Sequence, residues 1–294
     1  MSCIGRFAPS PTGPLHFGSL LAALASYLDM RSRNGEWLLR IEDLDPPREQ
    51  PGAADSILHT LDAFGLHWDG PVVYQSKRLK CYQDALEQLL NQGTAYRCSC
   101  SRKQLRARGV TGLYDGHCRR HPPSASASCA VRVIHPQAEQ QFHDRIQGFR
   151  TYDWQNDRGD FVVFRRDGLF AYQLAVVVDD AAAGVTDIVR GSDLIDETPH
   201  QIALQTLLGY STPQYAHIPV ITNQAGQKLS KQNLAPAIDP GQRQQLLLRA
   251  LSLLGQKPPA DLATASRDEL LSWAITHWNI TAVPGTLSLC EPET

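Results

Sequence analysis

Two short polar segments carry residues that could together bind the phosphates of a nucleotide. The first is RFAPSPTGPLHFG, from Arg6 to Gly18, between an apolar stretch and a run with helical spacing. A turn that opens a helix presents free backbone N–H groups and the positive end of the helix dipole, and both favour phosphate. Gly18 would let a nucleotide approach the backbone, and His16 could donate a hydrogen bond to a triphosphate. Taken alone, the segment is equally well explained as a rigid proline-rich connector.

The second segment is KLSKQ, from Lys228 to Gln232, which follows the apolar stretch HIPVIT. Lys228 and Lys231 stand beside Ser230, and two lysines at this spacing can hold a triphosphate as mobile point charges. On its own, such a loop is usually a solvated turn. Its interpretation as a phosphate-binding loop depends on its partnership with the first segment.

A third group of residues points to a metal ion. Three of the seven cysteines, Cys98, Cys100 and Cys118, lie in one short region. Three thiolates and one further ligand make a closed tetrahedral zinc site, which would be structural and would fold a small loop-rich segment. By its chemistry, either His117 or His121 is suitable as the fourth ligand. The alternative is that the cysteines are reduced and pack as small apolar side chains.

The sequence around the first segment predicts the scaffold that would position it. Cys3–Ala8 reads as a buried strand, the run from Ser19 through LLAALASYLDM has helical spacing, and WLLRIEDLD is a strand that ends in acids. Strand, tight turn, helix and strand make a βαβ unit, which begins a parallel doubly wound sheet. Two more helices are predicted at Ala53–Phe64 and Arg78–Asn91.

The composition changes between Arg97 and Ser128, where cysteine, arginine and histidine are frequent. Strands are predicted again at CAVRVI and, further on, at TDIVRG. Between them, FVVFRRDGLFAYQLAVVV is expected to form a hairpin with Asp167 and Gly168 at its turn.

Helices are expected in the last third of the chain. One is predicted at Thr198–Leu208, and two amphipathic helices should follow from about Pro240. The second of these is announced by Ser266 and, three residues later, Glu269, which is a capping-box pattern.

Composition limits the classes of protein to which the chain can belong. The 294 residues are 42% apolar and 20% charged, which is ordinary for a globular enzyme. The net charge of −2 exerts no general attraction on nucleic acid, so an RNA partner would need a local basic patch. No apolar stretch is long enough to cross a membrane, and the N-terminus does not resemble a signal peptide. We therefore expect a cytoplasmic protein without a membrane partner, with its cysteines mostly reduced, and a monomer.

Several segments resemble one family of enzymes when they are read together. PSPTGPLHFG resembles the HIGH signature of class I aminoacyl-tRNA synthetases, and KLSKQ resembles their KMSKS loop. RFAPSPTG, RIEDLD, VVVDD and IVRG are similar to segments of bacterial glutamyl-tRNA synthetases in particular. The resemblance extends from Cys3 to about Asn233. It implies an enzyme that uses ATP with Mg²⁺ to activate L-glutamate as an adenylate.

The resemblance also implies roles for individual residues. The positions that hold the side-chain carboxylate of glutamate are matched by Arg6, Tyr172 and Arg190, and those at its α-amino end by Ser10 and Glu42. Elementary chemistry agrees, because arginine binds carboxylates bidentately and a glutamate can pair with an ammonium. The ATP-binding positions are matched by His16, Gly18, Lys228, Ser230 and Lys231, and of these His16 and Lys231 are the expected catalytic residues.

The sequence also departs from the glutamyl-tRNA synthetases. About 60 residues follow Lys231, too few for the large helical domain with which those enzymes hold the anticodon. This shorter form resembles the glutamyl-Q tRNA(Asp) synthetases, which attach glutamate to queuosine, the modified first anticodon base of tRNA(Asp). That family has a zinc site in its insertion, and the resemblance implies Tyr114 as the fourth ligand beside Cys98, Cys100 and Cys118.

We therefore expect an α/β protein with a Rossmann-like class I synthetase catalytic domain, a zinc-bearing insertion and a short helical C-terminal tail. Residues 1–77 would form the first half of the Rossmann domain and 78–170 the insertion. Residues 171–235 would form the second half with the KMSKS-like loop, and 236–294 the tail.

The expected reaction is ATP-dependent glutamate activation followed by transfer to queuosine in tRNA(Asp). A short glutamyl-tRNA synthetase that charges a tRNA 3′ end is the first alternative. An enzyme that loads glutamate onto a protein or small molecule is the second, and a non-catalytic zinc and RNA-binding module is the third. The presence of Lys231, His16 and Glu42 argues against the third, because a protein without catalysis has no chemical need for them.

Overall fold

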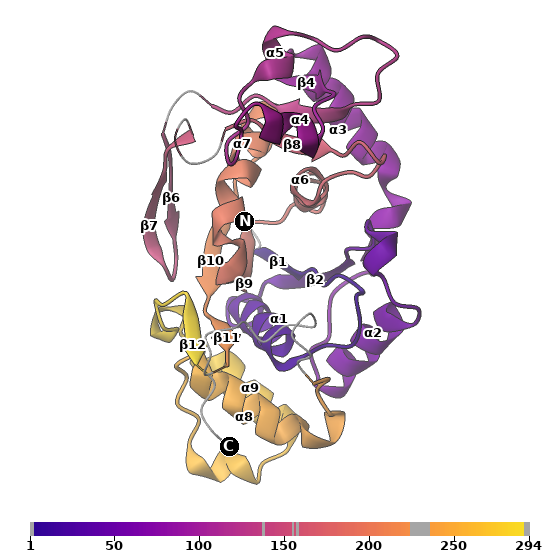
Figure 1. The fold of residues 1–294 in the computed structure, drawn as a ribbon. Coiled ribbons are helices and arrows are strands. Elements are labelled where there is room, and N and C mark those ends of the chain that lie inside the picture. Colours follow the sequence, from indigo (N-terminus) through magenta and orange to yellow (C-terminus); the bar gives the residue numbers. More distant parts are fainter. Residues whose placement is uncertain (1–2, 137–138, 155, 157–158, 224–235, 291–294) are drawn as a thin grey trace.

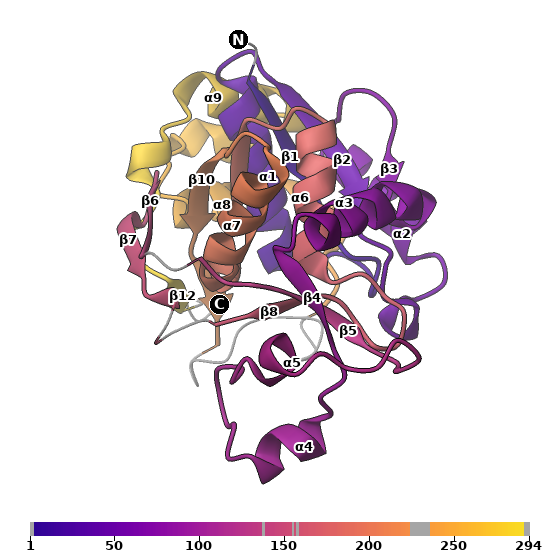
Figure 2. The same cartoon turned by 90° about the horizontal axis from the view of Figure 1, so that it is seen from above.

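A computed structural model of the protein describes residues 3–136, 139–154, 156, 159–223 and 236–290 (Figure 1). Lys228, Ser230 and Lys231, the expected phosphate-binding residues of KLSKQ, lie outside this described part. Parallel strands form the centre of the molecule, with helices on their faces (Figures 1 and 2).

The first half of this centre is the expected βαβ unit. Strands β1, β2 and β3 pair in parallel in the order β1-β2-β3, and α1 connects the first two. The helix begins at Phe17, and its N-cap is His16, the histidine of the first sequence segment. The elements are β1 (Ile4–Phe7), α1 (Phe17–Arg31), β2 (Glu36–Ile41), α2 (Ala53–Ala63), β3 (Val73–Tyr74) and α3 (Leu79–Asn91).

The second half is a sheet in the order β7-β6-β10-β9, in which β10 is parallel to both of its neighbours. The two halves meet where the Thr186 N–H donates to the Ile4 carbonyl at 2.8 Å. Its elements are β6 (Gln140–Asp144), β7 (Gly148–Tyr152), α6 (Tyr172–Ala182), β9 (Asp187–Gly191), α7 (Thr198–Leu208) and β10 (Gln214–Ile218).

The cysteine-rich region lies at one end of the molecule, beside an antiparallel sheet in the order β4-β5-β8. Figure 2 shows α4 projecting from this end, away from the parallel strands. The elements are β4 (Ala95–Cys98), α4 (Arg102–Ala107), α5 (His117–Arg120), β5 (Ala130–Val133) and β8 (Phe161–Phe164).

One sequence prediction is wrong here. Asp167 and Gly168 do form a turn, and Phe164 and Phe170 form an antiparallel bridge across it. The chain that follows is not the second strand of a hairpin but the helix α6, which is buried from Leu174 to Asp180. A short apolar run is compatible with a buried strand and with a buried helix, and periodicity alone cannot separate the two.

The tail packs against the first half of the centre. Helices α8 and α9 contribute Leu247, Leu251 and Leu270 to the same core as Leu20 and Trp37. The capping box of Ser266 and Glu269 is present, as the sequence predicts. A strand that was not predicted, β12, pairs with β11. The elements are β11 (Val220–Thr222), α8 (Arg243–Leu253), α9 (Arg267–His277) and β12 (Ser288–Cys290). Among the described residues, no helix combines the length and the apolar character that a membrane span requires.

Candidate active site and metal centre

Three residues that the sequence points to lie around one cavity. Arg6 from β1, Tyr172 from the first turn of α6 and Arg190 from β9 line a cavity of about 130 Å³. This is close to the ~150 Å³ of an engineered cavity that takes up benzene, so the space suits an amino-acid side chain rather than a nucleotide. The remaining lining residues are apolar: Phe7, Ala8, Ala22, Val189 and Leu194.

Arg190 is held from behind by neutral groups. It is only 5% exposed, and its Nε–H donates to His217 Nε2 at 3.0 Å. Its Nη2 donates to the hydroxyl of Thr198 at 2.8 Å and to the carbonyl of Leu194 at 3.3 Å. Its Nη1 is buried and has no hydrogen-bond partner among the described residues. A buried guanidinium N–H without a partner costs free energy, and it belongs here to a residue that lines the cavity.

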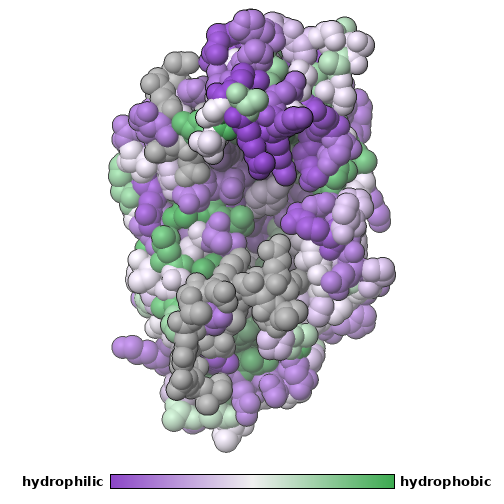
Figure 3. Space-filling model, in the orientation of Figure 1, coloured by the Kyte–Doolittle hydropathy of each residue, from purple (hydrophilic) through white to green (hydrophobic). Residues whose placement is uncertain are grey.

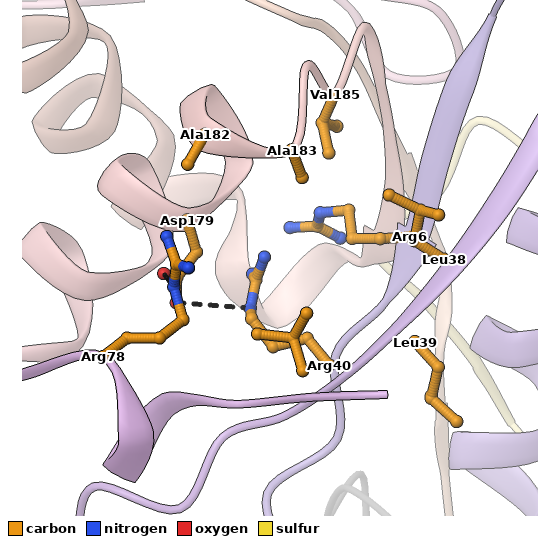
Figure 4. A pocket seen from close by; sticks show the side chains of 10 residues that line it. Arg6, Leu38, Leu39, Arg40, Arg78, Asp179, Ala182, Ala183 and Val185 are labelled. Carbon is orange, nitrogen blue, oxygen red and sulfur yellow. Dashed lines mark hydrogen bonds and ion pairs between the residues drawn. The ribbon is translucent and has the colours of Figure 1, made fainter. Parts of the chain in front are cut away.

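Arg6 is held differently, by a carboxylate. Its Nε donates to Asp180 at 3.2 Å, and Asp180 also accepts from Arg40 at 2.6 Å. Burial would raise the pKa of Asp180, but Arg40 and Arg6 outweigh it and lower the pKa. Figure 4 shows Arg6 and Arg40 projecting from adjacent strands toward α6, where Arg40 forms an ion pair with Asp179 at 3.8 Å. This network fixes the side chain of Arg6 beside the cavity.

Glu42 and Ser10 lie at the ends of the first two strands. Glu42 is largely buried and accepts from Arg40 at 3.2 Å, and its backbone N–H donates to the Pro9 carbonyl. Burial raises the pKa of Glu42, although Arg40 and Arg6 oppose this rise. Ser10 is exposed, and its carbonyl accepts from the Thr12 N–H at 2.9 Å. Neither residue lines the small cavity, which fits a role at the opposite end of a bound amino acid.

His16 and Gly18 stand where the sequence places them, at the start of α1. His16 Nδ1 accepts from the backbone N–H of Ser19 at 3.2 Å, so the histidine caps the helix. It also forms a bridge with Ala237, just after the KLSKQ loop in the chain. The beginning of α1 and Ala237 are therefore neighbours.

The cysteine cluster brings together the groups of a metal site. The Sγ atoms of Cys98, Cys100 and Cys118 all lie within 4.8 Å of one another. The Tyr114 hydroxyl lies 3.4 Å from the Sγ of Cys98 and 3.4 Å from that of Cys100. A tetrahedral ion with bonds of about 2.3 Å to sulfur places two sulfurs roughly 3.8 Å apart. The measured separations of 3.4 Å are close to this value, as expected for ligands at the corners of one tetrahedron. His117 and His121 are not members of the cluster among the described residues, and their rings stack on each other.

The electrostatics of the cluster favour a thiolate. Burial would raise the pKa of Cys118, but hydrogen bonds with Tyr114 and Cys100 outweigh it and lower this pKa to about 6. Burial and the neighbouring thiols raise the pKa of Tyr114, so its phenol would need the charge of an ion to become a ligand. Arg108 donates to Cys100 at 3.3 Å and adds positive charge beside the sulfurs.

The sequence analysis did not predict several residues that position the side chains of the site. His217, Thr198 and Leu194 hold Arg190, and Asp180 holds Arg6. The acids of VVVDD gave a signal, because two acids within an apolar run must be paired if that run is buried. His217 gave none, since a single histidine in an apolar strand is most often a core residue.

Comparison with known proteins identifies the family. Residues 3–283 match the family model of the catalytic domain of class I tRNA synthetases for E and Q. A glutamyl-Q tRNA(Asp) synthetase of Pseudomonas fluorescens is 53% identical over 99% of this chain and 97% of its own length. One of Chromobacterium violaceum is 56% identical over 97% of both chains.

Solved structures show the same fold. A glutamate-tRNA synthetase from Elizabethkingia anophelis superposes with a TM-score of 0.83 and 25% identity, over 99% of this chain and 68% of its own. A glutamate tRNA ligase from Elizabethkingia meningosepticum, in complex with its amino acid, gives a TM-score of 0.81 and 25% identity. The match covers 97% of this chain and 66% of the ligase.

Proposed function

The chain belongs to the class I tRNA synthetases for glutamate and glutamine, within them to the glutamyl-Q tRNA(Asp) synthetases, and from this premise we propose its reaction. It activates L-glutamate with ATP and transfers the glutamyl group to queuosine at the first anticodon position of tRNA(Asp). We also propose that the protein acts as a monomer.

One observation supports glutamate as the amino acid. Arg190 lines a cavity of side-chain size, and its buried Nη1 has no hydrogen-bond partner in the part of the chain that the structure describes. A γ-carboxylate would supply both the acceptor and the negative charge that this group lacks. The amide of glutamine would supply only an acceptor. Arg6 and Tyr172, which also line the cavity, would take the remaining lone pairs of the carboxylate.

The chemistry proceeds in two balanced steps. An α-carboxylate oxygen of glutamate bonds to the α-phosphorus of ATP, the bond from that phosphorus to the bridging oxygen breaks, and pyrophosphate leaves. A hydroxyl of the queuosine ring then attacks the mixed anhydride, AMP leaves, and the hydroxyl proton passes to solvent.

We assign to His16 the stabilisation of charge on the transferring phosphate, and to Lys231 the stabilisation of charge on pyrophosphate. We assign the binding of ATP to Lys228, Ser230 and Gly18. Mg²⁺ bound with ATP neutralises phosphate charge.

We assign a structural zinc ion to Cys98, Cys100, Cys118 and Tyr114. Closed sites with thiolate ligands fold short loop-rich segments, and the ion would join the end of β4 to α5. With these four ligands the ion would have no open coordination position, so it would be structural and take no part in the reaction.

A basic surface on the insertion supports RNA as the acceptor. Residues 97–121 include seven arginines or lysines and a single acid, although the whole chain has a net charge of −2. Arg102, Lys103 and Arg106 are exposed on α4, and none forms an ion pair with a described residue. The face in Figure 3 is strongly hydrophilic at this end of the molecule. Local positive charge of this kind binds phosphates of a nucleic acid.

The test is to incubate the protein with labelled glutamate, ATP and tRNA(Asp) with or without queuosine. Label should enter only the queuosine-bearing tRNA. It should still enter after the terminal adenosine has been removed enzymatically, because that treatment leaves queuosine intact. Transfer that trimming abolishes would instead assign the protein to the enzymes that charge 3′ ends. A labelled product that resists ribonuclease would assign it to those that load proteins or small molecules.

A further inference from the structure

Two fully buried residues stand behind Arg190 in a chain of hydrogen bonds. His217 Nδ1 lies 2.5 Å from a carboxylate oxygen of Asp144, and His217 Nε2 accepts from Arg190 Nε at 3.0 Å. Asp144 and His217 both have an exposed fraction of 0%. Asp144 comes from the end of β6, His217 from β10 and Arg190 from β9, which are neighbouring strands of one sheet.

The surroundings of Asp144 determine how the imidazole is protonated. Its Oδ1 accepts the backbone N–H groups of Ile146, Gln147 and His217 at 3.0, 2.8 and 3.1 Å. Its Oδ2 faces His217 Nδ1, which must therefore donate. Nε2 is left with a lone pair, and this lone pair accepts the Arg190 Nε–H. A second proton, on Nε2, would make the ring positively charged. Its Nε2–H would then face the Nε–H of the Arg190 guanidinium, which is also positively charged.

This chain of hydrogen bonds from Asp144 through His217 to Arg190, here called the relay, also explains why the charge of Arg190 remains available to a substrate. Arg6 is paired directly with Asp180, whereas no carboxylate in the described part of the chain forms an ion pair with Arg190. A carboxylate in direct contact with Arg190 would compete with the carboxylate of a substrate. The imidazole accepts the hydrogen bond without supplying a negative charge, and Asp144 acts one ring away.

We propose that Asp144 and His217 are positioning residues, which hold Arg190 so that its unpartnered Nη1 points at the substrate's γ-carboxylate and distinguishes glutamate from glutamine. This role rests on the proposed function, since it needs glutamate in the cavity. It predicts that the tautomer of a histidine outside the cavity sets affinity for the amino acid. Neither residue lines the cavity or has contact with the reacting atoms.

Asp144→Asn tests the relay with almost no change of shape. The side-chain oxygen must stay on the three backbone N–H groups, so the new NH₂ faces His217 Nδ1 and forces the proton to Nε2. The KM for glutamate in pyrophosphate exchange should rise roughly tenfold to a hundredfold, because a buried hydrogen bond becomes a clash of donors. The preference for glutamate over glutamine should fall, while the KM for ATP should not change.

Two substitutions of His217 form a matched pair. Gln can place an oxygen near the position of Nε2 and accept from Arg190, whereas Asn can replace only Nδ1 and loses that acceptor. His217→Gln should therefore stay near the wild-type KM for glutamate, and His217→Asn should resemble Asp144→Asn. Glutamine has no tautomers, so adding Asp144→Asn to His217→Gln should have little further effect, which a double-mutant cycle measures. ¹⁵N NMR of the His217 ring should show a proton on Nδ1 in the wild type and on Nε2 in Asp144→Asn.

The possible outcomes distinguish a failure of the proposed function from a failure of the positioning role. A wild-type protein without glutamate-dependent exchange contradicts the proposed function, and the positioning role with it. An active wild type with an unchanged glutamate KM in Asp144→Asn contradicts the relay alone. The relay is equally contradicted if Asp144→Asn has the same effect in the His217→Gln background, because that result indicates a general loss of packing.

Discussion

At the scale of residues, the cavity contains two arginines that do different work. Arg6 is neutralised by Asp180 and forms part of the wall, whereas Arg190 has neutral partners and retains its charge. A buried charge without a counter-ion is unfavourable, so an empty cavity is costly and an anionic occupant is favoured.

Substitution of Arg190 by Ala should sharply weaken glutamate activation. Removing one partner of a buried charge pair costs about 3–5 kcal/mol, which corresponds to roughly two to four decades in kcat/KM. Glutamate-dependent pyrophosphate exchange measures this loss. Exchange at the wild-type level would refute the assignment of Arg190.

Stability should depend on pH through His217. Burial and the charge of Arg190 lower its pKa to about 4, although Asp144 opposes this shift and Asp193 also acts to raise the pKa. An unfolded chain binds a proton on this ring below about pH 6.5 and the folded chain does not, so stability is complete above that pH and falls toward pH 4. The loss should be roughly 3 kcal/mol, from about 1.4 kcal/mol per pKa unit.

The measurement is the free energy of unfolding in denaturant at pH 7 and pH 4.5. His217→Gln should lose less stability across this interval than the wild type. His59→Gln, at an exposed histidine, is the control and should lose as much as the wild type. Equal losses in all three proteins would mean that His217 is not held neutral by the fold.

The sequence could indicate some of these residues and not others. The resemblance implied Arg6, Tyr172 and Arg190, which do lie around one cavity, and their roles in binding glutamate remain predictions. Asp144 and His217 could not be found in this way, because they stand 73 positions apart and meet only through the pairing of strands. No local pattern marks such a contact.

At the scale of elements, predictions held where a segment carried its own boundary signals. Helix α7 has the predicted bounds, Thr198–Leu208, and α9 begins at its predicted capping box. Helix α6 was mistaken for a strand because its sequence, YQLAVVVDDAA, is buried on nearly all sides and has no polar face. What decides its conformation is tertiary packing, which a short window of sequence does not contain.

The cysteine cluster predicts a metal content. Purified protein should carry about one zinc per chain, and Cys98→Ser should lose it and make residues 98–128 sensitive to protease, because the ion holds that loop-rich segment together. Elemental analysis and limited proteolysis measure these effects. Cys81→Ser, at an exposed cysteine on α3, is the matched control. Protein prepared without chelator that has no metal would leave the cysteines as packing residues.

Helix α4 predicts a salt-dependent contact with tRNA. Replacing Arg102, Lys103 and Arg106 together by Ala should weaken tRNA binding and lower the slope of log affinity against log salt by roughly two to three, since each phosphate contact releases about one counter-ion. Glutamate activation without tRNA should be unaffected. Lys257→Ala, at an exposed lysine of the tail, is the control. An unchanged affinity and slope would place the RNA elsewhere.

At the scale of the whole molecule, the tail is part of the catalytic core. Leu270 of α9 has an exposed fraction of 0% and belongs to one cluster with residues of α1 and β2. Leu270→Ala should cost about 2–5 kcal/mol, and the tail and the parallel sheet should still unfold in one transition. Denaturation followed by far-UV dichroism and tryptophan fluorescence measures both. Leu287→Ala, at an exposed leucine, should have little effect. A separate early transition would show an independent tail.

The pairing of β12 with β11 has a consequence for folding of the chain during its synthesis. Gln147 donates to the carbonyl of Thr286 at 3.0 Å and to that of His217 at 2.8 Å, and Ser192 donates to the carbonyl of Leu287. These late residues thus brace the strands that carry Arg190 and His217. While the chain is still on the ribosome, β9 and β10 can be synthesised and yet lack this support. These strands therefore gain this support only after residues 286–290 have emerged from the exit tunnel.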